Sequence, residues 1–412
     1  MGLLRAWNRI NLFTRIMIGF AVGVAVGVIF GPQASVLEFL GTILIRLLSM
    51  VVAPLVLCML ICAAADVGDV KTLGRMGITT TLFYTLTTVV AISVGLFFAY
   101  VMNVGTGVDL NLEGQAGSAV NVPSMITTLV NIIPSNPFAA LNTANLLQIM
   151  FFAMIFGFAL TKLKGEGSKI TIEFFRTCAN VMKEIVNIVL AFTPIGVMGT
   201  MANVVGKHGL AIMLPFGKII LATYIACALY FVLFQSVLLA GVLGRTNPLT
   251  FIKKMREPAL FAFATCSSVA TMPLTLKSTK ELGASEKVAN FVIPYGTVIN
   301  LDGSAIYQAI AVVFTAQIYG VDLTITQLAL VVLSATLASI GTAGVPGSAL
   351  IMLTVVLGAV NLPIEAVALL AGIDRILNMA RVVPNVIGDA AVAMIIERQD
   401  RKYAQQEAKV TA

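Results

Sequence analysis

The sequence DRILNMARVVPNVIGD, residues 374–389, decides how this chain folds. It lies between the apolar runs AVALLAG and AAVAMII, so its hydropathy places it inside a membrane helix. Its charged and amide side chains recur every three or four residues, at Asp374, Asn378, Arg381, Asn385 and Asp389. On a helix of about 3.6 residues per turn, these five residues form one continuous stripe, about 22 Å long.

This stripe is expected to face protein, ions or substrate, because a charge at bilayer depth costs a few kcal/mol. Ion pairing between helices explains two of the charges. Together with Arg375 beside the stripe, however, there are six polar residues, and ion pairing explains so many poorly. Pro384 removes a backbone donor within the stripe and frees a nearby carbonyl to bind something else. The stretch therefore predicts a functional site inside the membrane.

The composition indicates a protein that crosses the membrane several times. The chain has 412 residues, of which 58% are hydrophobic and 11% charged, and its mean hydropathy is +0.98. Soluble proteins have about 25% charged residues. The net charge of +7 does not indicate a nucleic-acid partner, because no basic run is interleaved with aromatic residues. No cleavable signal peptide is expected, since the first apolar run leads into further membrane segments.

The cysteines and the histidine do not indicate a metal centre. The five cysteines have no His or carboxylate neighbours at zinc-site spacing, so buried, unpaired thiols are expected. The one histidine, His208, is expected to be a solvated loop residue. Ser267 and Ser268 have no His or Lys base at a recognisable spacing, so the chain is not expected to be an enzyme.

Eight apolar stretches have the length that a bilayer requires. They lie at about 14–31, 36–64, 78–102, 145–163, 176–205, 210–243, 288–318 and 364–396. If the N-terminus is cytoplasmic, the loops left outside hold Lys207 and no arginine, whereas the inside loops are rich in Lys and Arg. The positive-inside rule therefore predicts a multi-pass protein of the cell's inner (plasma) membrane with both termini cytoplasmic.

This topology requires two further segments, about 258–279 and 328–359, to enter the membrane and return on the same side. Each has two apolar arms joined by a small polar tip with a proline, CSSVATMP in the first and SIGTAGVPGS in the second. Irregular backbone at membrane depth is tolerated only where it lines a protein-enclosed cavity. Re-entrant helical hairpins are therefore predicted.

The two hairpins also form an internal repeat. Pro273 precedes Asn300 by 27 residues, and Pro346 precedes Asp374 by 28 residues. A hairpin followed by a polar helix, twice and from opposite sides, is an inverted repeat, which places substrate and ion sites at the midplane. The expected fold is thus an all-α polytopic membrane protein with eight transmembrane helices, two re-entrant hairpins and inverted repeats.

Three clusters of oxygen donors lie in the last third of the chain: 296–304 around Asp302, the tip 339–347, and Asn385 with Asp389. Oxygen ligands without His or Cys suit a hard, weakly bound cation such as Na⁺. Each cluster alone is a weak signal, since Gly and Ser are common at transmembrane packing interfaces. Their coincidence predicts sodium sites, and proton coupling stays open as the alternative.

Arg381 is the expected substrate residue. A guanidinium in a low-dielectric cavity needs a counter-anion, and its planar fork fits a carboxylate. The hairpin tips, with backbone N–H groups and Ser267 and Ser268, can hold a second carboxylate, so a small dicarboxylate or acidic amino acid is predicted. The alternative is a permanent pair between Arg381 and Asp374, for which Arg375 competes.

These motifs resemble the glutamate transporter family, the dicarboxylate/amino acid:cation symporters, over essentially the whole chain. Asn300-Leu-Asp-Gly-Ser is similar to the family's Asn-Met-Asp-Gly-Thr, and Cys266-Ser-Ser to its serine-rich first hairpin tip. Ser339-Ile-Gly-Thr-Ala-Gly-Val-Pro-Gly is similar to its second tip. The run from Met379 to Asp389 is similar to its eighth helix. The resemblance implies the fold of the excitatory amino acid transporters, a homotrimer in the lipid bilayer, and an elevator-type movement.

The resemblance also implies a division of the chain. Residues 1–77 would form scaffold, 78–103 transport domain, 104–208 scaffold and trimer contacts, 209–398 the transport core, and 399–412 a cytoplasmic tail.

Three Na⁺ sites follow from the resemblance, residue by residue. The first would use Gly296, Asn300, Asn385 and Asp389, the second Val298, Ser339, Ile340 and Thr342, and the third Tyr84, Thr87, Thr88, Asn300 and Asp302. The substrate site would comprise Arg381, Asn378, Asn385, Asp374, Arg375, Ser267, Ser268, Ser304, Val345 and Gly344.

Two departures from the family bear on the substrate. Asn378 stands where the amino-acid transporters have an aspartate that pairs with the substrate's ammonium, and Val382 replaces a supporting hydroxyl residue. Losing that counter-charge should cost an amino acid on the order of 1–3 kcal/mol and an amine-free dicarboxylate nothing. We therefore expect a Na⁺-coupled importer of acidic substrates whose site leans toward amine-free C4-dicarboxylates. Because of the family resemblance, aspartate and glutamate are expected equally as substrates. The alternatives are proton coupling or a substantial anion-channel activity.

Overall fold

The computed structural model describes residues 12–68, 70–106, 130, 132–163, 165–340 and 348–411. Within these ranges the regular structure is helical and contains no strand, so the expected all-α membrane fold is confirmed. The helices of the first half are α2 (Leu12–Phe30), η1 (Gly31–Leu37), α3 (Glu38–Gly68), α4 (Val70–Val101), α6 (Pro137–Asn142), α7 (Leu146–Leu160) and α8 (Glu166–His208). They are followed by η2 (Gly209–Ile212), α9 (Met213–Leu229), η3 (Tyr230–Leu243), α10 (Pro248–Thr265), α11 (Ser268–Glu281), α12 (Glu286–Ile299), α13 (Asp302–Ile318), α14 (Ile325–Ile340), α15 (Ser348–Ala359), α16 (Ala366–Ala371) and α17 (Asp374–Thr411).

Among the described residues, six helical stretches are long and apolar enough to cross a membrane. They are Thr14–Leu47, Met76–Val101, Glu166–Lys207, Gly209–Leu243, Glu286–Ile318 and Asp374–Tyr403. The expected spans 36–64 and 145–163 correspond to α3 and α7, within which shorter apolar stretches occur. The count of eight spans stays a prediction. His208 is the last residue of α8, so the expected loop begins after it.

Both predicted hairpins are built from paired helices. α10 packs against α11, and the chain reverses at Cys266 and Ser267. Cys266 has a φ of 56°, in the left-handed region that a residue with a Cβ rarely adopts. α14 packs against α15 in the same way. Their connection, residues 341–347, lies outside the described residues.

Two helices that hydropathy reads as continuous are interrupted at the polar stretches. The chain leaves the helical conformation at Asn300 and Leu301, between α12 and α13, within the expected span 288–318. The expected single helix 364–396 was wrong, because α16 ends at Ala371 and α17 begins at Asp374. Asp374 is therefore in the first turn of α17, where the helix dipole favours a negative charge.

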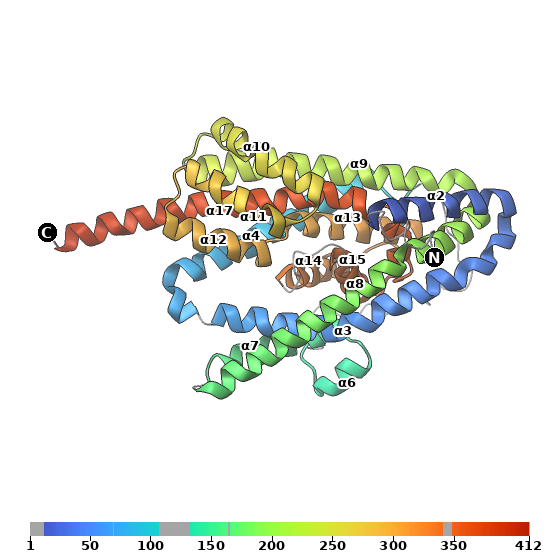
Figure 1. Ribbon diagram of the computed structural model, residues 1–412, viewed down its shortest axis with the longest axis horizontal. Coiled ribbons are helices and arrows are strands. Elements are labelled where there is room, and N and C mark those ends of the chain that lie inside the picture. The colour runs from blue at the N-terminus through green and yellow to red at the C-terminus, as the bar shows by residue number, and fades with distance from the viewer. Residues whose placement is uncertain are drawn as a thin grey trace, which may run out of the picture.

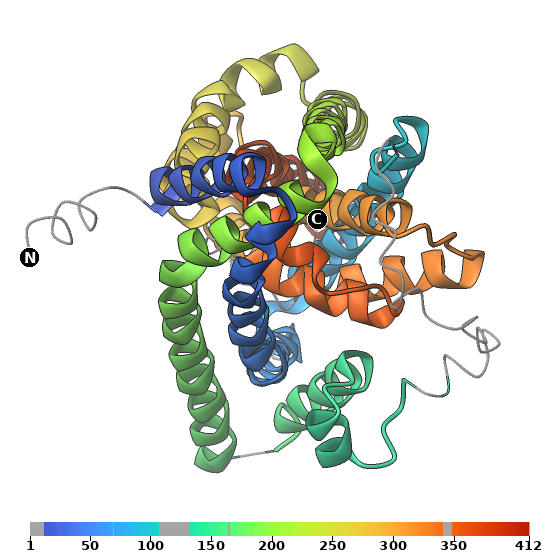
Figure 2. The ribbon, with the colours of Figure 1, turned by 90° about the vertical axis from the view of Figure 1, so that its right-hand side faces the viewer.

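The helices form two groups. α2, α3, α7 and α8 pack on one another, whereas α4, α9, η3 and α10 to α13 gather around α17. In Figures 1 and 2, the green α7 and the start of α8 lie away from the yellow α10. The first group is held by close backbone contacts, because a Cβ on Gly23 of α2 would lie 2.5 Å from the Met198 carbonyl oxygen of α8. Gly27 repeats this contact one turn later, 2.9 Å from the Ala202 carbonyl oxygen.

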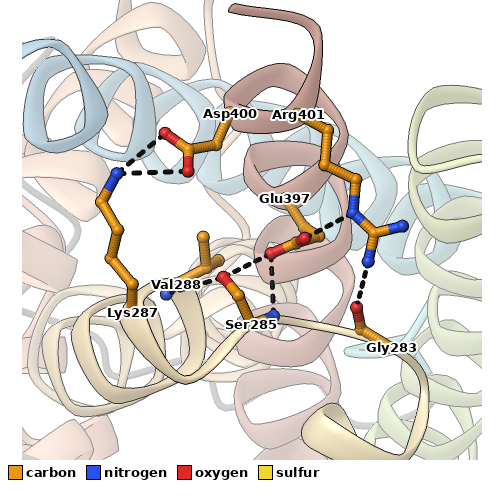
Figure 3. A network of polar contacts seen from close by, with 7 residues as sticks. All are labelled: Gly283, Ser285, Lys287, Val288, Glu397, Asp400 and Arg401. Carbon is orange, nitrogen blue, oxygen red and sulfur yellow. Dashed lines mark hydrogen bonds and ion pairs between the residues drawn. The ribbon is translucent and has the colours of Figure 1, made fainter. Parts of the chain in front are cut away.

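The far end of α17 binds the turn between α11 and α12 (Figure 3). The Glu397 carboxylate accepts hydrogen bonds from the backbone N–H of Ser285 at 2.8 Å, from its hydroxyl at 2.7 Å, and from Arg401 Nε at 2.6 Å. Arg401 also donates to the Gly283 carbonyl oxygen at 2.7 Å. This buried carboxylate therefore attaches the first hairpin and α12 to α17.

We predict that Glu397→Ala destabilises the protein by about 2–3 kcal/mol, because two donors of Ser285 and one of Arg401 lose a buried, charged acceptor. The measurement is the apparent melting temperature in detergent. The matched control is Glu286→Ala, whose carboxylate is 85% exposed and pairs with Lys280 at 3.3 Å, so less than about 1 kcal/mol should be lost. Equal losses in the two variants would contradict this role of Glu397.

Candidate functional site

Arg381 is the largest fully buried side chain of the described residues, with 1% of its surface exposed. Its Nη1 donates to Asp374 Oδ1 at 2.7 Å, and its Nε donates to Asn378 Oδ1 at 3.1 Å. The Tyr307 ring of α13 lies with its centroid 4.7 Å from Arg381 Cζ, a cation–π contact. The structure thus pairs Arg381 with Asp374, which is the alternative that the sequence left open.

Arg375 points elsewhere. Its Nη2 donates to the Thr265 carbonyl oxygen, at the end of α10, at 3.3 Å. The expectation that it competes for Asp374 was wrong, because the first hairpin tip lies within its reach. Arg375 therefore joins α17 to the first hairpin next to Cys266.

The two serines of the first tip lie where α11 begins. Ser267 is the N-cap, and its Oγ accepts a hydrogen bond from the Ala270 N–H at 3.2 Å. Ser268 is the first helical residue and is buried. Their expected contact with a second carboxylate stays a prediction. The tip places backbone N–H groups of a helix N-terminus at this point, which is a suitable environment for an anion.

The residues expected for the first ion site come together around Asp389, which is 2% exposed. Asn300 Nδ2 donates to Asp389 Oδ1 at 2.9 Å and to the Asn385 carbonyl oxygen at 3.1 Å. A Cβ on Gly296 would overlap both Asp389 Oδ1 and the Tyr84 hydroxyl. Glycine is therefore needed at 296 for the carboxylate and the hydroxyl to meet there.

The residues expected for the third ion site surround Asp302, which is fully buried. Thr88 Oγ1 donates to Asp302 Oδ1 at 3.0 Å, and Thr87 Oγ1 lies 3.2 Å from the same oxygen. Sequence reasoning missed a further neighbour, since the Tyr230 hydroxyl lies 2.8 Å from Asp302 Oδ2. Tyr230 and Gln235 are polar residues within the apolar run ALYFVLFQSVLL, a signal that could have identified them.

The second expected ion site is only partly described. Ser339 is 1% exposed, and its Oγ has no hydrogen-bond partner among the described residues. Val298 is half exposed, at 51%, and Ile340 is the last residue of α14. Thr342, Gly344 and Val345 lie outside the described residues. This site therefore stays a prediction.

The residues expected for substrate and those expected for ions meet where α13 begins. The Gly303 N–H donates to Asn385 Oδ1 at 2.8 Å, and a Cβ on Gly303 would overlap the Arg381 carbonyl oxygen. Ser304, the next residue, is 8% exposed. One buried region thus contains the Arg381 guanidinium paired with Asp374, together with the carboxylates of Asp302 and Asp389 and the amide and hydroxyl side chains around them. Such a region can bind an organic anion together with small cations.

The chain is similar to known transporters along nearly its whole length. It matches the model of the sodium:dicarboxylate symporter family over residues 12–399. It is 36% identical over 415 residues to the proton/sodium-glutamate symport protein of Geobacillus stearothermophilus, covering 98% of this chain and 97% of that protein. It is 33% identical over 381 residues to the proton/glutamate-aspartate symporter of Escherichia coli, covering 89% and 86%. It is 31% identical over 399 residues to the C4-dicarboxylate transport protein of Pseudomonas savastanoi pv. phaseolicola, covering 94% and 85%.

We predict that Gly303→Ala destabilises the protein by about 1–3 kcal/mol, because its methyl group must displace the Arg381 backbone. The control is Gly217→Ala in α9, where an added Cβ meets nothing within 4 Å. There alanine should be neutral or stabilising by up to about 1 kcal/mol, given its higher helix propensity. Apparent melting temperatures in detergent test both, and an unchanged value for Gly303→Ala would contradict the close contact between α13 and α17.

Proposed function

This chain belongs to the sodium:dicarboxylate symporter family, whose members are transporters and not enzymes, and we propose that it imports small dicarboxylates together with Na⁺. The observation that carries the proposal is the buried Arg381, whose bonds to Asp374 and Asn378 use Nη1 and Nε. A guanidinium has five N–H donors in a planar fork that fits a carboxylate. Arg381 is therefore the group that would bind the substrate.

The bond between Arg381 and Asp374 supports an exchange of partners. A buried guanidinium must keep an anion nearby, because leaving it unpaired costs several kcal/mol. Asp374 supplies that anion in this structure, and a substrate carboxylate would take its place in the loaded state. Asp374 is 9% exposed and in the first turn of α17, where the helix dipole stabilises it after release.

Two features support Na⁺ as the coupling ion. Asp302 and Asp389 are both fully or nearly fully buried, Thr88 Oγ1 donates to Asp302 and Asn300 Nδ2 donates to Asp389. The carboxylate, hydroxyl and amide side chains gathered here carry oxygen ligands, which suit a hard cation. Proton coupling is the second candidate, because the Escherichia coli relative is named a proton/glutamate-aspartate symporter.

The substrate preference that we propose comes from Asn378 and Val382. An ammonium beside Arg381 would find the neutral Asn378, which already accepts a hydrogen bond from Arg381. Val382, one residue after Arg381, packs with Ala262 and Val386 in an apolar cluster. The site therefore favours C4-dicarboxylates without an amine, such as succinate, over aspartate and glutamate. The C4-dicarboxylate transport protein among the relatives is consistent with this preference.

We propose an elevator-type movement of the helices around α17 against the group of α2, α3, α7 and α8, in a homotrimer of the plasma membrane with cytoplasmic termini. Its support is the packing of the helices into these two groups. The boundaries proposed between them lie after residues 77, 103 and 208.

The test is uptake of radiolabelled succinate and L-aspartate by the protein in proteoliposomes. With an inward Na⁺ gradient, succinate should accumulate and exceed aspartate, since only the amine-free substrate avoids an unpaired ammonium. Liposomes with choline in place of Na⁺ are the control. Succinate uptake that a proton gradient drives equally well without Na⁺ would contradict sodium coupling.

Asn378→Asp should reverse the preference, because the new carboxylate pairs with the ammonium. Binding of L-aspartate relative to succinate should rise about 5- to 100-fold, corresponding to about 1–3 kcal/mol. Isothermal titration calorimetry measures both affinities. The control is Asn290→Asp at an exposed position of α12, which should leave the ratio unchanged. An unchanged ratio in Asn378→Asp would show that Asn378 does not set the preference.

A further inference from the structure

The sixth apolar span contributes a π-helical segment, η3, which begins at Tyr230. π-Helical turns are rare and are frequent at functional sites. Tyr230 and Gln235 are five residues apart in it, about one π-helical turn, and both are buried, at 2% and 0% exposure. Neither belongs to the residues that the sequence motifs indicated for an ion site.

Tyr230 faces more oxygens than it has hydrogens. Its hydroxyl lies 2.8 Å from the Thr87 carbonyl oxygen and 2.8 Å from Asp302 Oδ2, but it can donate one hydrogen. Thr87 and Thr88 add two hydroxyl hydrogens and three close contacts, to the Tyr84 carbonyl oxygen and to Asp302 Oδ1. Three hydroxyl hydrogens thus serve five oxygen–oxygen contacts, so at least two of these contacts have no hydroxyl hydrogen between their oxygens.

Gln235 adds an oxygen without a partner. Its Nε2 donates to the Pro384 carbonyl oxygen at 2.8 Å, and its side chain also interacts with Asp302. Its Oε1 is buried and, like Asn300 Oδ1, has no hydrogen-bond partner among the described residues. Both amides lie next to Gly388, where a Cβ would be 2.6 Å from Asn300 Nδ2 and 2.8 Å from Gln235 Nε2.

A buried carbonyl-type oxygen without a donor is costly, and a cation relieves that cost. Asp302 contributes one carboxylate, and the other oxygens of the cluster are neutral, so the charge matches one monovalent cation. Hydroxyl, amide and carbonyl oxygens are the ligands that such a hard ion accepts.

We propose that Tyr230 and Gln235 are residues of a coupling-cation site on Asp302, with Gln235 Oε1 as a ligand and Tyr230 as the group that positions the carboxylate. The inference rests on the proposed sodium coupling and extends it to the sixth span. Because Gln235 also binds the Pro384 carbonyl oxygen, the ion would be connected to α17 three residues after Arg381. Cation binding and substrate binding would then share one helix.

The test is a Na⁺ titration of the purified protein in detergent, with choline chloride holding the ionic strength and the melting temperature as the readout. In Gln235→Leu the Na⁺ concentration at half-effect should rise about 10-fold or more. In Tyr230→Phe it should rise in the same direction, by up to about 10-fold, since the positioning group is lost and the ligand remains. Gln235→Glu, which keeps a side-chain oxygen, should retain Na⁺ binding and is the second variant if Gln235→Leu fails to fold.

The control is Gln317→Leu on α13, whose Oε1 accepts the Gly105 N–H at 2.7 Å, away from these carboxylates. It should lower the melting temperature equally in Na⁺ and choline and leave the Na⁺ midpoint unchanged. A purely structural role for Gln235 would give that same pattern and would overturn the inference. If the wild-type protein itself shows no Na⁺-dependent stabilisation, the proposed sodium coupling fails, and that result is distinct from an unchanged midpoint in the variants.

Discussion

The buried charge of Arg381 is the constraint on which the rest of this structure depends. A guanidinium with 1% exposure must be paired, and the first turn of α17 supplies Asp374 at 2.7 Å. The interruption between α16 and α17 places Asp374 at a helix start. Gly303 lets α13 approach the Arg381 backbone, and the Tyr307 ring covers the guanidinium. These features hold the Arg381 guanidinium at membrane depth. On the proposed mechanism, a substrate carboxylate would compete there with Asp374 for the guanidinium.

The charges around Arg381 do not balance without further cations. Asp374, Asp302 and Asp389 are buried with Arg381. With all three carboxyl groups ionised, the region has an excess of two negative charges, which protons or metal cations would have to compensate. A dicarboxylate would add more negative charge, so its entry would be unfavourable unless cations enter with it. Asn385 connects the two clusters, because its side chain binds α13 at Gly303 and its carbonyl oxygen binds Asn300. On this account, coupling between ion and substrate is a consequence of charge compensation within one buried network.

Much of the architecture could be predicted from the sequence, since periodicity and hydropathy are local signals. The polar stripe on α17 and the first hairpin follow from the pattern of polar and apolar residues. Contacts between distant segments do not. Gln235 reaches Pro384 and Asp302 from another helix, and no spacing within the sixth span indicates that partner. The end of α16 was missed for a related reason, because AVALLAG is apolar throughout and its hydropathy has no boundary at Gly372. The direction of Arg375 toward Thr265 depends on the packing of α10 against α17.

The central claim is that Arg381 exchanges Asp374 for a substrate carboxylate. The most direct measurement is an experimental structure of the protein with succinate and Na⁺ bound, by electron cryomicroscopy. We expect a succinate carboxylate on the Arg381 guanidinium, with the distance between Arg381 Nη1 and Asp374 Oδ1 increased from 2.7 Å to beyond the range of an ion pair, about 4 Å. An unchanged Arg381–Asp374 bond with succinate bound elsewhere would contradict it and would make the pair a permanent structural one.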